Sequence, residues 1–307
     1  MLNLAAATRS PRVMRALTGL TITEFRALMP SFIKAEKKAQ AERDANRRHK
    51  RQRKPGGGGK PALRNPEDRL LFVLVYLKAY PTQDVHAVLF GNTQAWACEW
   101  IHRLLPVLEA TLGRKAVLPQ RPAIGTLAAL RRQCPELCYL LDATERPICR
   151  PRGEKLQREF YSGKKKRHAV KNTVVTHHKD GKVLFLGKTH SARIHDKRAA
   201  EKDGLRLPKG SVGFSDSGYQ GYNPPGVIML RPRKKRRGGK LTRRDKVYNR
   251  SLASARVAVE HTLSGVKRCR IVHDTFRNRR KGMRDSVMMI ACGLHNHRVI
   301  HRSMNWR

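Results

Sequence analysis

Acidic residues are scarce in this sequence of 307 residues. Lys and Arg number 66 and Asp and Glu only 23, so the formal net charge is 66 − 23 = +43 at pH 7. A chain this basic needs a polyanionic partner, because its cations otherwise repel one another. We therefore expect nucleic acid as the partner, with an anionic membrane surface as the less favoured alternative.

Long apolar runs are missing as well. The longest, Leu70 to Leu77, has 8 residues, whereas a membrane-spanning helix needs about 20. The N-terminus has no basic segment ahead of its short apolar stretch, so no secretory signal is expected. We expect a soluble, intracellular protein without a membrane partner.

The six cysteines are few and scattered, which excludes a disulfide framework. Cys134 and Cys138 have a CxxxC spacing, but no second Cys/His pair follows at a matching distance. We interpret them as reduced structural thiols, and a zinc site is the less favoured alternative.

The first 60 residues predict a basic helical segment that ends in a linker. Residues 34–60 contain 11 basic and 3 acidic residues and include Gly56 to Gly59. A charged helix followed by a flexible glycine linker explains this composition. The helix could also lie along a phosphate backbone, which would add affinity without sequence readout.

Residues 61–118 predict three helices. Pro66 begins the first, Thr82 caps the second, and a turn at 90–93 precedes the third. This order is typical of a helix-turn-helix. The third helix would then present polar residues to the major groove, namely Thr93, Gln94, Glu99, His102 and Arg103. The simpler alternative is that this helix only packs a bundle, which we prefer for Trp96 and Trp100.

The second half of the chain, at about 135–300, predicts an α/β domain with a mixed sheet flanked by helices. Short apolar runs typical of buried strands occur at 138–141, 172–176, 183–186, 212–215 and 224–231. Helices are expected at 194–203 and 248–268. Residues 231–250 contain 11 basic residues and 1 acid, which predicts a basic loop between strand and helix that is disordered without DNA.

The placement of the few acids is informative. Asp142 and Asp216 each follow an apolar strand, and Glu260 lies on an amphipathic helix. Three carboxylates brought together repel one another unless cations lie among them. Mg²⁺ and Mn²⁺ prefer such oxygen ligands. Two such ions about 3.5–4 Å apart can stabilise both oxygens of an in-line phosphoryl displacement.

Each acid also has a simpler interpretation. Asp216 precedes Ser-Gly and could only shape a turn. Glu260 could pair with Arg256 or Lys267 along its helix. For any single acid the spacing favours this structural role, and only the three together, in so basic a chain, point to nucleic-acid chemistry.

Four motifs then carry a resemblance to a known family. They are Tyr161 to His168 (YSGKKKRH), Ser191 to Asp196 (SARIHD), Asp216 to Gly221 (DSGYQG), and Arg256 to Glu260 (RVAVE) with Lys267 after it. In this order they resemble bacterial insertion-sequence transposases of the acid-triad (DDE) type with a helix-turn-helix N-terminus, related to the Harbinger-type enzymes. The resemblance runs from about Pro61 to His297.

The resemblance implies an RNase H-like catalytic domain in which Asp142, Asp216 and Glu260 are the catalytic acids and hold two Mg²⁺ or Mn²⁺ ions. Asp196 matches another recurrent acid of the family and is a rival to Asp216. The chain departs from the pattern at Ala253, where many relatives carry Tyr. Further residues would contact DNA phosphate, namely Lys164, Lys165, Lys166, Arg167, Arg256 and Lys267.

The implied activity is cut-and-paste DNA transposition or a related reaction. The partners would be double-stranded DNA, both the terminal inverted repeats of a mobile element and the target. A homodimer or larger assembly on DNA is expected, in the bacterial cytoplasm at the nucleoid. The alternatives are a catalytically inactive DNA-binding protein derived from a transposase, and an RNA- or ribosome-associated protein that the charge alone would permit.

Overall fold

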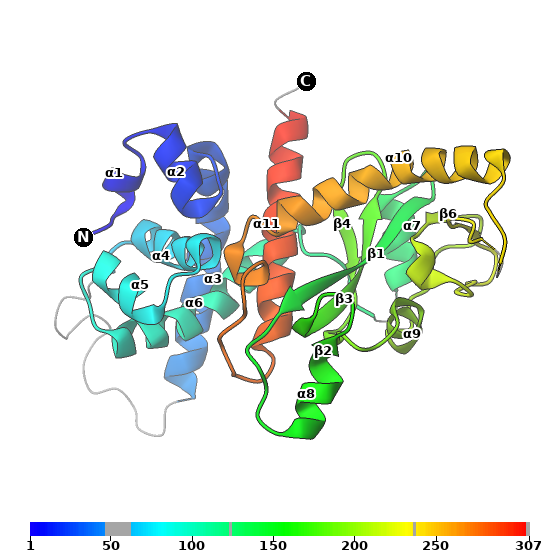
Figure 1. The fold of residues 1–307 in the computed structure, drawn as a ribbon. Coiled ribbons are helices and arrows are strands. Elements are labelled where there is room, and N and C mark those ends of the chain that lie inside the picture. The colour runs from blue at the N-terminus through cyan, green and yellow to red at the C-terminus, as the bar shows by residue number, and fades with distance from the viewer. Residues whose placement is uncertain (47–62, 123–124, 236–237, 305–307) are drawn as a thin grey trace. The chain divides into compact units, whose positions relative to one another are not determined.

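The computed structural model describes residues 1–46, 63–122, 125–235 and 238–304. The predicted glycine linker at 56–59 lies outside these ranges. The chain forms two compact units. The helical unit comprises Met1–Leu118, Arg268–Val272 and Ser286–Arg307, and the sheet unit comprises Pro119–Lys267 and His273–Asp285 (Figure 1).

The helical unit is built from α-helices and one 3-10 turn. These are α1 (Leu4–Ala7), α2 (Pro11–Thr18), α3 (Ile22–Ala45), α4 (Pro66–Ala79), α5 (Gln83–Leu89), α6 (Gln94–Arg114), η2 (Arg270–Val272) and most of α11 (Met283–Met304). No helix in the described part of the chain combines the length and apolarity that crossing a bilayer requires.

The three predicted helices of this unit are confirmed as α4, α5 and α6. Pro66 occupies the first turn of α4, and residues 70–77 are buried along the whole of its apolar segment. The Thr82 and Thr93 hydroxyls accept hydrogen bonds from Val85 N (3.3 Å) and Trp96 N (3.4 Å), so both residues cap the following helix. Capping thus separates three helices that apolar periodicity alone would blur.

The sheet unit contains a mixed seven-stranded sheet with helices around it, as the sequence predicts. Strand order is β2-β3-β1-β6-β7, and β4 and β5 also pair with β3. The strands are β1 (Cys138–Pro147), β2 (Tyr161–Ser162), β3 (Arg167–His177), β4 (Val183–Leu186), β5 (His190–Ser191), β6 (Val212–Phe214) and β7 (Ile228–Leu230). The helices are α7 (Thr126–Gln133), α8 (Glu154–Phe160), α9 (Asp196–Lys202), η1 (Ser217–Tyr219) and α10 (Arg243–Val266).

Two elements differ from the prediction. The first strand does not end at Asp142 but continues to Pro147, because residues 139–147 pair antiparallel with β3. The basic loop expected at 231–250 is helical from Arg243, because Thr242 and Asp245 form a capping box that begins α10 there. Helix α10 therefore begins earlier in the chain than the apolar periodicity indicates.

Candidate active site

The register of two parallel strands brings Asp142 and Asp216 to one level of the sheet. The last pair between β1 and β6 is Leu140↔Phe214, and each aspartate lies two residues beyond its member of that pair. Because side chains alternate along a strand, both follow the same face. Neighbouring parallel strands thus deliver two carboxylates to one place.

Asp142 is held among like charges. The pKa of its carboxyl is raised to about 6, chiefly by burial and also by the charges of Asp216 and Asp196. The Ala143 N–H, which donates to Asp142 Oδ1 at 2.8 Å, and the Arg256 guanidinium act in the opposite direction. Three aspartates of a chain with only 23 acids therefore meet at this site.

Asp216 and Asp196 lie on either side of Gly218. Gly218 N donates to Asp216 Oδ1 at 2.8 Å, which closes the turn at η1. A Cβ on Gly218 would lie 2.9 Å from that same oxygen and closer still to Asp196 Oδ2. The glycine in the DSGYQG motif is thus required for the two carboxylates to approach each other.

Asp196, the rival of Asp216, already has a cation beside it. It is the first residue of α9, and its Oδ1 accepts from Lys171 Nζ at 2.7 Å. Lys171 is buried on β3 and also lies 3.7 Å from Glu145 Oε1. Asp196 therefore forms an ion pair with Lys171. Asp216 instead lies with Asp142 at the end of the parallel strand pair β1 and β6.

Helix α10 carries the remaining candidates, and it packs against β1 and β6. The Arg256 charge acts on Asp142, and the Asp142 charge acts on Lys267, the C-cap residue of α10. Glu260 is exposed on this helix. Asp142, Asp216 and Glu260, all among the described residues, do not bring three oxygens within 4.8 Å of one another.

The acid cluster has the donor chemistry of a hard-cation site. Its ligand atoms are carboxylate oxygens, and Asp142 carries unfavourable interactions with two other carboxylates that a divalent cation would relieve. Arg256 Nε is buried and, among the described residues, has no hydrogen-bond acceptor. A phosphate oxygen at this place would supply one.

The basic hairpin, Lys164 to Arg167, lies beside the same site. These four residues join β2 to β3 and are all exposed. The charges of Lys165 and Arg167 lower the pKa of Lys267, whose largest perturbation is burial. The charge of Asp142 also acts on the pKa of Lys267. The hairpin cations and the acid cluster therefore lie in one region of the sheet unit.

The polar residues of α6 are placed less uniformly than the sequence predicts. Thr93 and Gln94 are exposed at the helix start, where Gln94 bonds to Gln83. Arg103 instead donates to Gln40 Oε1 at 2.7 Å and lies over the Trp100 ring at 4.7 Å. The start of α6 is thus presented to solvent, whereas Arg103 is held by neighbouring side chains.

Three tyrosines in or near the motifs also differ in exposure. Tyr219 and Tyr222 are buried in the core of the sheet unit with Tyr139 and Phe185. Tyr161 is 41% exposed on β2. Packing therefore accounts for the first two.

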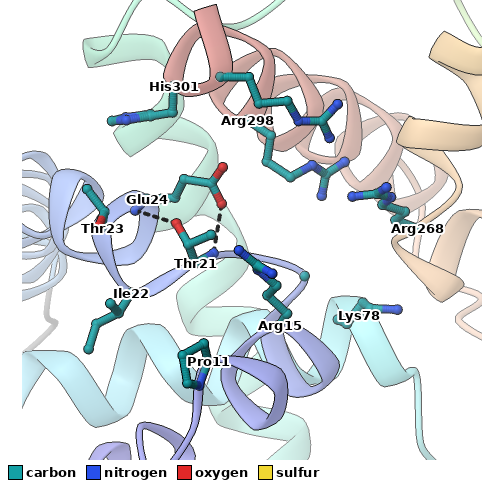
Figure 2. A pocket seen from close by; sticks show the side chains of 12 residues that line it. Pro11, Arg15, Thr21, Ile22, Thr23, Glu24, Lys78, Arg268, Arg298 and His301 are labelled. Carbon is teal, nitrogen blue, oxygen red and sulfur yellow. Dashed lines mark hydrogen bonds between the residues drawn. The ribbon is translucent and has the colours of Figure 1, made fainter. Parts of the chain in front are cut away.

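A cationic recess in the helical unit is a feature that the sequence analysis missed. The recess has a volume of about 780 Å³, and Figure 2 shows side chains from α2, α3, α4 and α11 around it. Glu24 is its one acidic residue and is engaged in a capping box with Thr21 at the start of α3. The cations that line it are Arg15, Lys78, Arg268, Arg298 and Arg302.

The recess concentrates positive charge. Burial lowers the pKa of the Arg298 guanidinium, and the charges of Arg268 and Arg302 lower it further. These cations come from distant parts of the sequence, so no local charge run marks them. Only the fold brings them together around one recess.

Two parts of the chain match known protein families. Residues 141–296 match the family model described as DDE superfamily endonuclease, and residues 61–114 match the helix-turn-helix of DDE superfamily endonuclease. The chain is 31% identical over 252 residues to "Probable transposase for insertion sequence element IS702" of Microchaete diplosiphon, covering 81% of this chain and 86% of that protein. No solved structure matches significantly.

Proposed function

The chain belongs to the DDE superfamily endonucleases, and from that premise we propose that it is the transposase of an insertion sequence. It binds the terminal inverted repeats, cuts DNA strands at the ends of the element, and joins the freed 3′-hydroxyl groups to target DNA. One observation supports the proposal most strongly. Asp142 on β1 and Asp216 just after β6 lie at the same level of the sheet, and the Arg256 charge of α10 acts on Asp142.

The residue roles follow from this placement. Two Mg²⁺ or Mn²⁺ ions held by Asp142, Asp216 and Glu260 would stabilise charge on the attacking and leaving oxygens. Arg256 and Lys267 hold the scissile phosphate, because both lie within electrostatic reach of Asp142. Lys171 keeps Asp196 neutralised and in position. The assignment requires Glu260, exposed one turn beyond Arg256, to join the two aspartates when DNA is bound.

DNA is held by three further surfaces. The exposed start of α6, with Thr93 and Gln94, reads the inverted repeat in the major groove. The basic hairpin contacts backbone phosphates near the reacting strand. The cationic recess binds another phosphate, which would relieve the repulsion around Arg298. Both ends of the element must be cut together, so the active form is a dimer or larger assembly.

A second function has one observation in its favour. The three assigned acids lie farther apart than ligands of one metal site in this structure, as a transposase-derived protein that only binds DNA would show. Such a protein would bind the inverted repeats and cut nothing.

Cleavage of DNA that carries the element's own ends decides between these functions. We expect nicks at the ends with Mg²⁺ or Mn²⁺ for the wild type and none for Asp216→Asn. Asp196→Asn is the matched control, because it removes the neighbouring carboxylate that pairs with Lys171. End binding, measured by gel shift, should be equal in all three proteins.

The other outcomes are equally clear. If Asp216→Asn cuts like the wild type and Asp196→Asn does not, the two acids exchange roles. If no protein cuts although all bind the ends, the binding-only function replaces the proposed one.

A further inference from the structure

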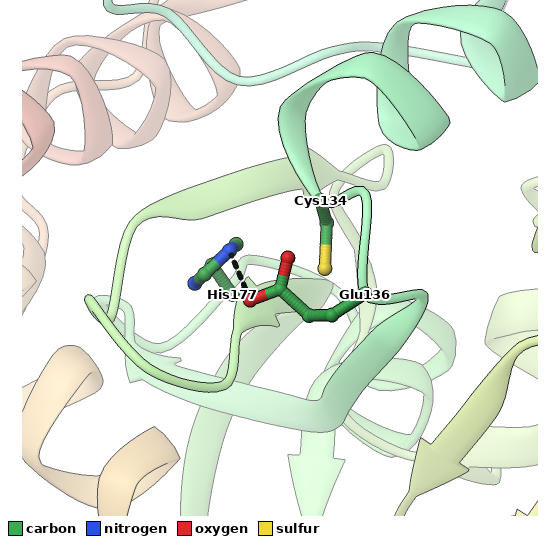
Figure 3. A group of neighbouring side chains, drawn as sticks. All are labelled: Cys134, Glu136 and His177. Carbon is green, nitrogen blue, oxygen red and sulfur yellow. Dashed lines mark ion pairs between the residues drawn. The ribbon is translucent and has the colours of Figure 1, made fainter.

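A second group of possible metal ligands lies in the sheet unit, apart from the acid cluster. Cys134, Glu136 and His177 each offer one ligand atom, and these atoms all lie within 4.8 Å of one another. Figure 3 shows the thiol, the carboxylate and the imidazole side by side. Cys134 follows α7, Glu136 lies in the loop before β1, and His177 ends β3. Cys134 and His177 are buried, while Glu136 reaches solvent.

The distance between the nitrogen and oxygen ligands matches two ligands of a single small ion, and the Cys134 sulfur lies within 4.8 Å of both. His177 Nε2 lies 3.3 Å from Glu136 Oε1. In a tetrahedral zinc site with Zn–N and Zn–O bonds of about 2.0–2.1 Å, the two ligand atoms are about 3.3–3.4 Å apart. The distance therefore needs no adjustment to accommodate zinc.

The other nitrogen of His177 is held by the turn that follows β3. His177 Nδ1 lies 3.1 Å from Asp180 Oδ1, and it accepts from Lys179 N at 3.3 Å and Asp180 N at 3.2 Å. Asp180 is itself fixed by Lys182 N at 2.9 Å and Lys182 Nζ at 2.8 Å. The turn thus fixes the imidazole with Nε2 beside Glu136. In a zinc site the proton would lie on Nδ1 and be donated to Asp180, as is common for metal-bound histidines.

We propose that Cys134, Glu136 and His177 bind one Zn²⁺, with water at the fourth position on the solvent side. One thiolate, one carboxylate and a neutral imidazole balance the two charges of the ion. The sulfur and nitrogen ligands select zinc, whereas the all-carboxylate cluster around Asp142 selects Mg²⁺ or Mn²⁺. The two sites therefore differ in the metal that they take, and the zinc site does not depend on the proposed transposase function.

The zinc site lies at the start of β1 and the end of β3, away from the acid cluster. Tyr139 pairs with His177, and Asp142 lies three residues farther along β1, about 10 Å at the rise of an extended strand. The ion would join the end of α7 to the end of β3. Its role is to stabilise this junction, because it lies too far from Asp142 to contact a reacting phosphate.

Without an ion, the same residues form ordinary contacts. Glu136 then pairs with His177 and with Lys179 at 3.7 Å. The Cys134 thiol donates to the Cys138 carbonyl at 3.3 Å. An experiment must separate this ion-pair arrangement from a zinc site.

Titration of the full-length protein with Co²⁺ makes that separation. Tetrahedral Co²⁺ bound to a thiolate gives a sulfur-to-metal charge-transfer band that carboxylate-bound Co²⁺ lacks. We expect one equivalent of Co²⁺ to produce the band and one equivalent of Zn²⁺ to remove it. The band should disappear in Cys134→Ser and require at least about 10-fold more Co²⁺ in Glu136→Gln. Asp216→Asn should leave it unchanged.

Cys138→Ser is the matched control, because Cys138 is half-buried and is not among the clustered ligands. It should keep the band at wild-type affinity. Glu136→Gln alters a side chain at the surface, so it tests the site even if Cys134→Ser folds poorly, which circular dichroism would reveal. The proposal is overturned if the wild type gives no stoichiometric band, if Cys138→Ser loses it, or if Glu136→Gln binds Co²⁺ like the wild type.

Discussion

Each unit holds a cluster of like charges, and the two clusters have opposite sign. In the helical unit, five cations and one acid line the recess. In the sheet unit, three aspartates gather where β1 and β6 end their pairing. Like charges repel within each cluster, and burial of Arg298 in one and of Asp142 in the other removes water that would screen them. The comparison teaches that candidate binding sites in this chain are marked by unbalanced charge, which a phosphate would relieve in one unit and a metal ion in the other.

The largest effect that sharpens this comparison is expected for Asp142→Asn. DNA cleavage should fall by roughly 10²–10³-fold or more, because a metal ligand at the reacting phosphate is lost. In a chelator of divalent ions, the same variant should be more stable than the wild type by about 1–3 kcal/mol at pH 7. Cleavage assays and urea denaturation measure the two effects.

The sign of the stability change follows from the pKa. The folded pKa of Asp142 is about 6, above the model-peptide value of 3.8, so the folded state keeps this proton more tightly. Its contribution to stability is therefore lost as the pH rises between these two values. Asn carries no charge and avoids the loss.

Asp196→Asn is the control with the opposite expectation. It removes the partner at 2.7 Å from buried Lys171 and leaves only Glu145 at 3.7 Å. The protein should lose about 1–3 kcal/mol. If Asp142→Asn destabilises the protein as Asp196→Asn does, the acid cluster is not under the repulsion that we infer.

Acidification should act on the helical unit in the opposite sense. Burial lowers the pKa of His86 and of His297 to about 4, against 6.5 in model peptides. Below pH 6.5 the histidines of the unfolded chain bind protons, whereas those of the folded unit stay neutral down to about pH 4. The contribution of these groups to the free energy of unfolding is therefore complete above pH 6.5 and falls as the pH drops towards 4. The loss is on the order of 3 kcal/mol for each histidine at the lower end.

His86→Phe tests this pH dependence. His86 packs among the rings of Phe72, Tyr76 and Phe90, so phenylalanine suits the site. Thermal unfolding from pH 7 to pH 4 should be less pH-dependent in the variant. An unchanged slope would show that His86 does not titrate in this range.

The smallest effect is expected in the recess. Arg15→Ala and Lys78→Ala should each lower the slope of log K against log salt by about 1, because each removes one phosphate contact. Arg158→Ala is the control, since Arg158 is exposed and pairs with Glu154 in the sheet unit. Fluorescence anisotropy with end DNA from 50 to 300 mM salt, a range of about sixfold, measures the slope. Equal slopes in all proteins would remove the recess from the DNA-binding surface.

Local signals in the sequence predicted much of the fold. The cap at Thr82, the turn at 90–93, the Pro66 helix start and the strand at 183–186 all appear as expected, because each depends on neighbours in the chain. The extent of β1 could not be read in this way. Its second half is a strand because β3 pairs with it, and an apolar run says nothing about pairing.

The same distinction between local signals and strand pairing applies to the candidate sites. Asp142 and Asp216 could be chosen because each follows an apolar run, and the structure places them at one level. The ion pair of Asp196 with Lys171 could not be predicted, since the two lie 25 residues apart. The grouping of Cys134 with His177 could not be predicted either, since the two lie 43 residues apart. Strand register decides these contacts, and composition does not encode it.

The helical unit is assembled from three separate stretches of chain, and this has a consequence for synthesis. Residues 268–272 and 286–304 belong to it and supply buried side chains such as Ile271, Ile290 and Leu294. A ribosome makes these stretches only after nearly all of the sheet unit has emerged. The helical unit therefore cannot finish folding early in translation, although proteins generally fold from the N-terminus onward. A nascent chain that stops before α11 would lack a complete DNA-binding unit, so engagement with DNA is deferred until translation is nearly finished.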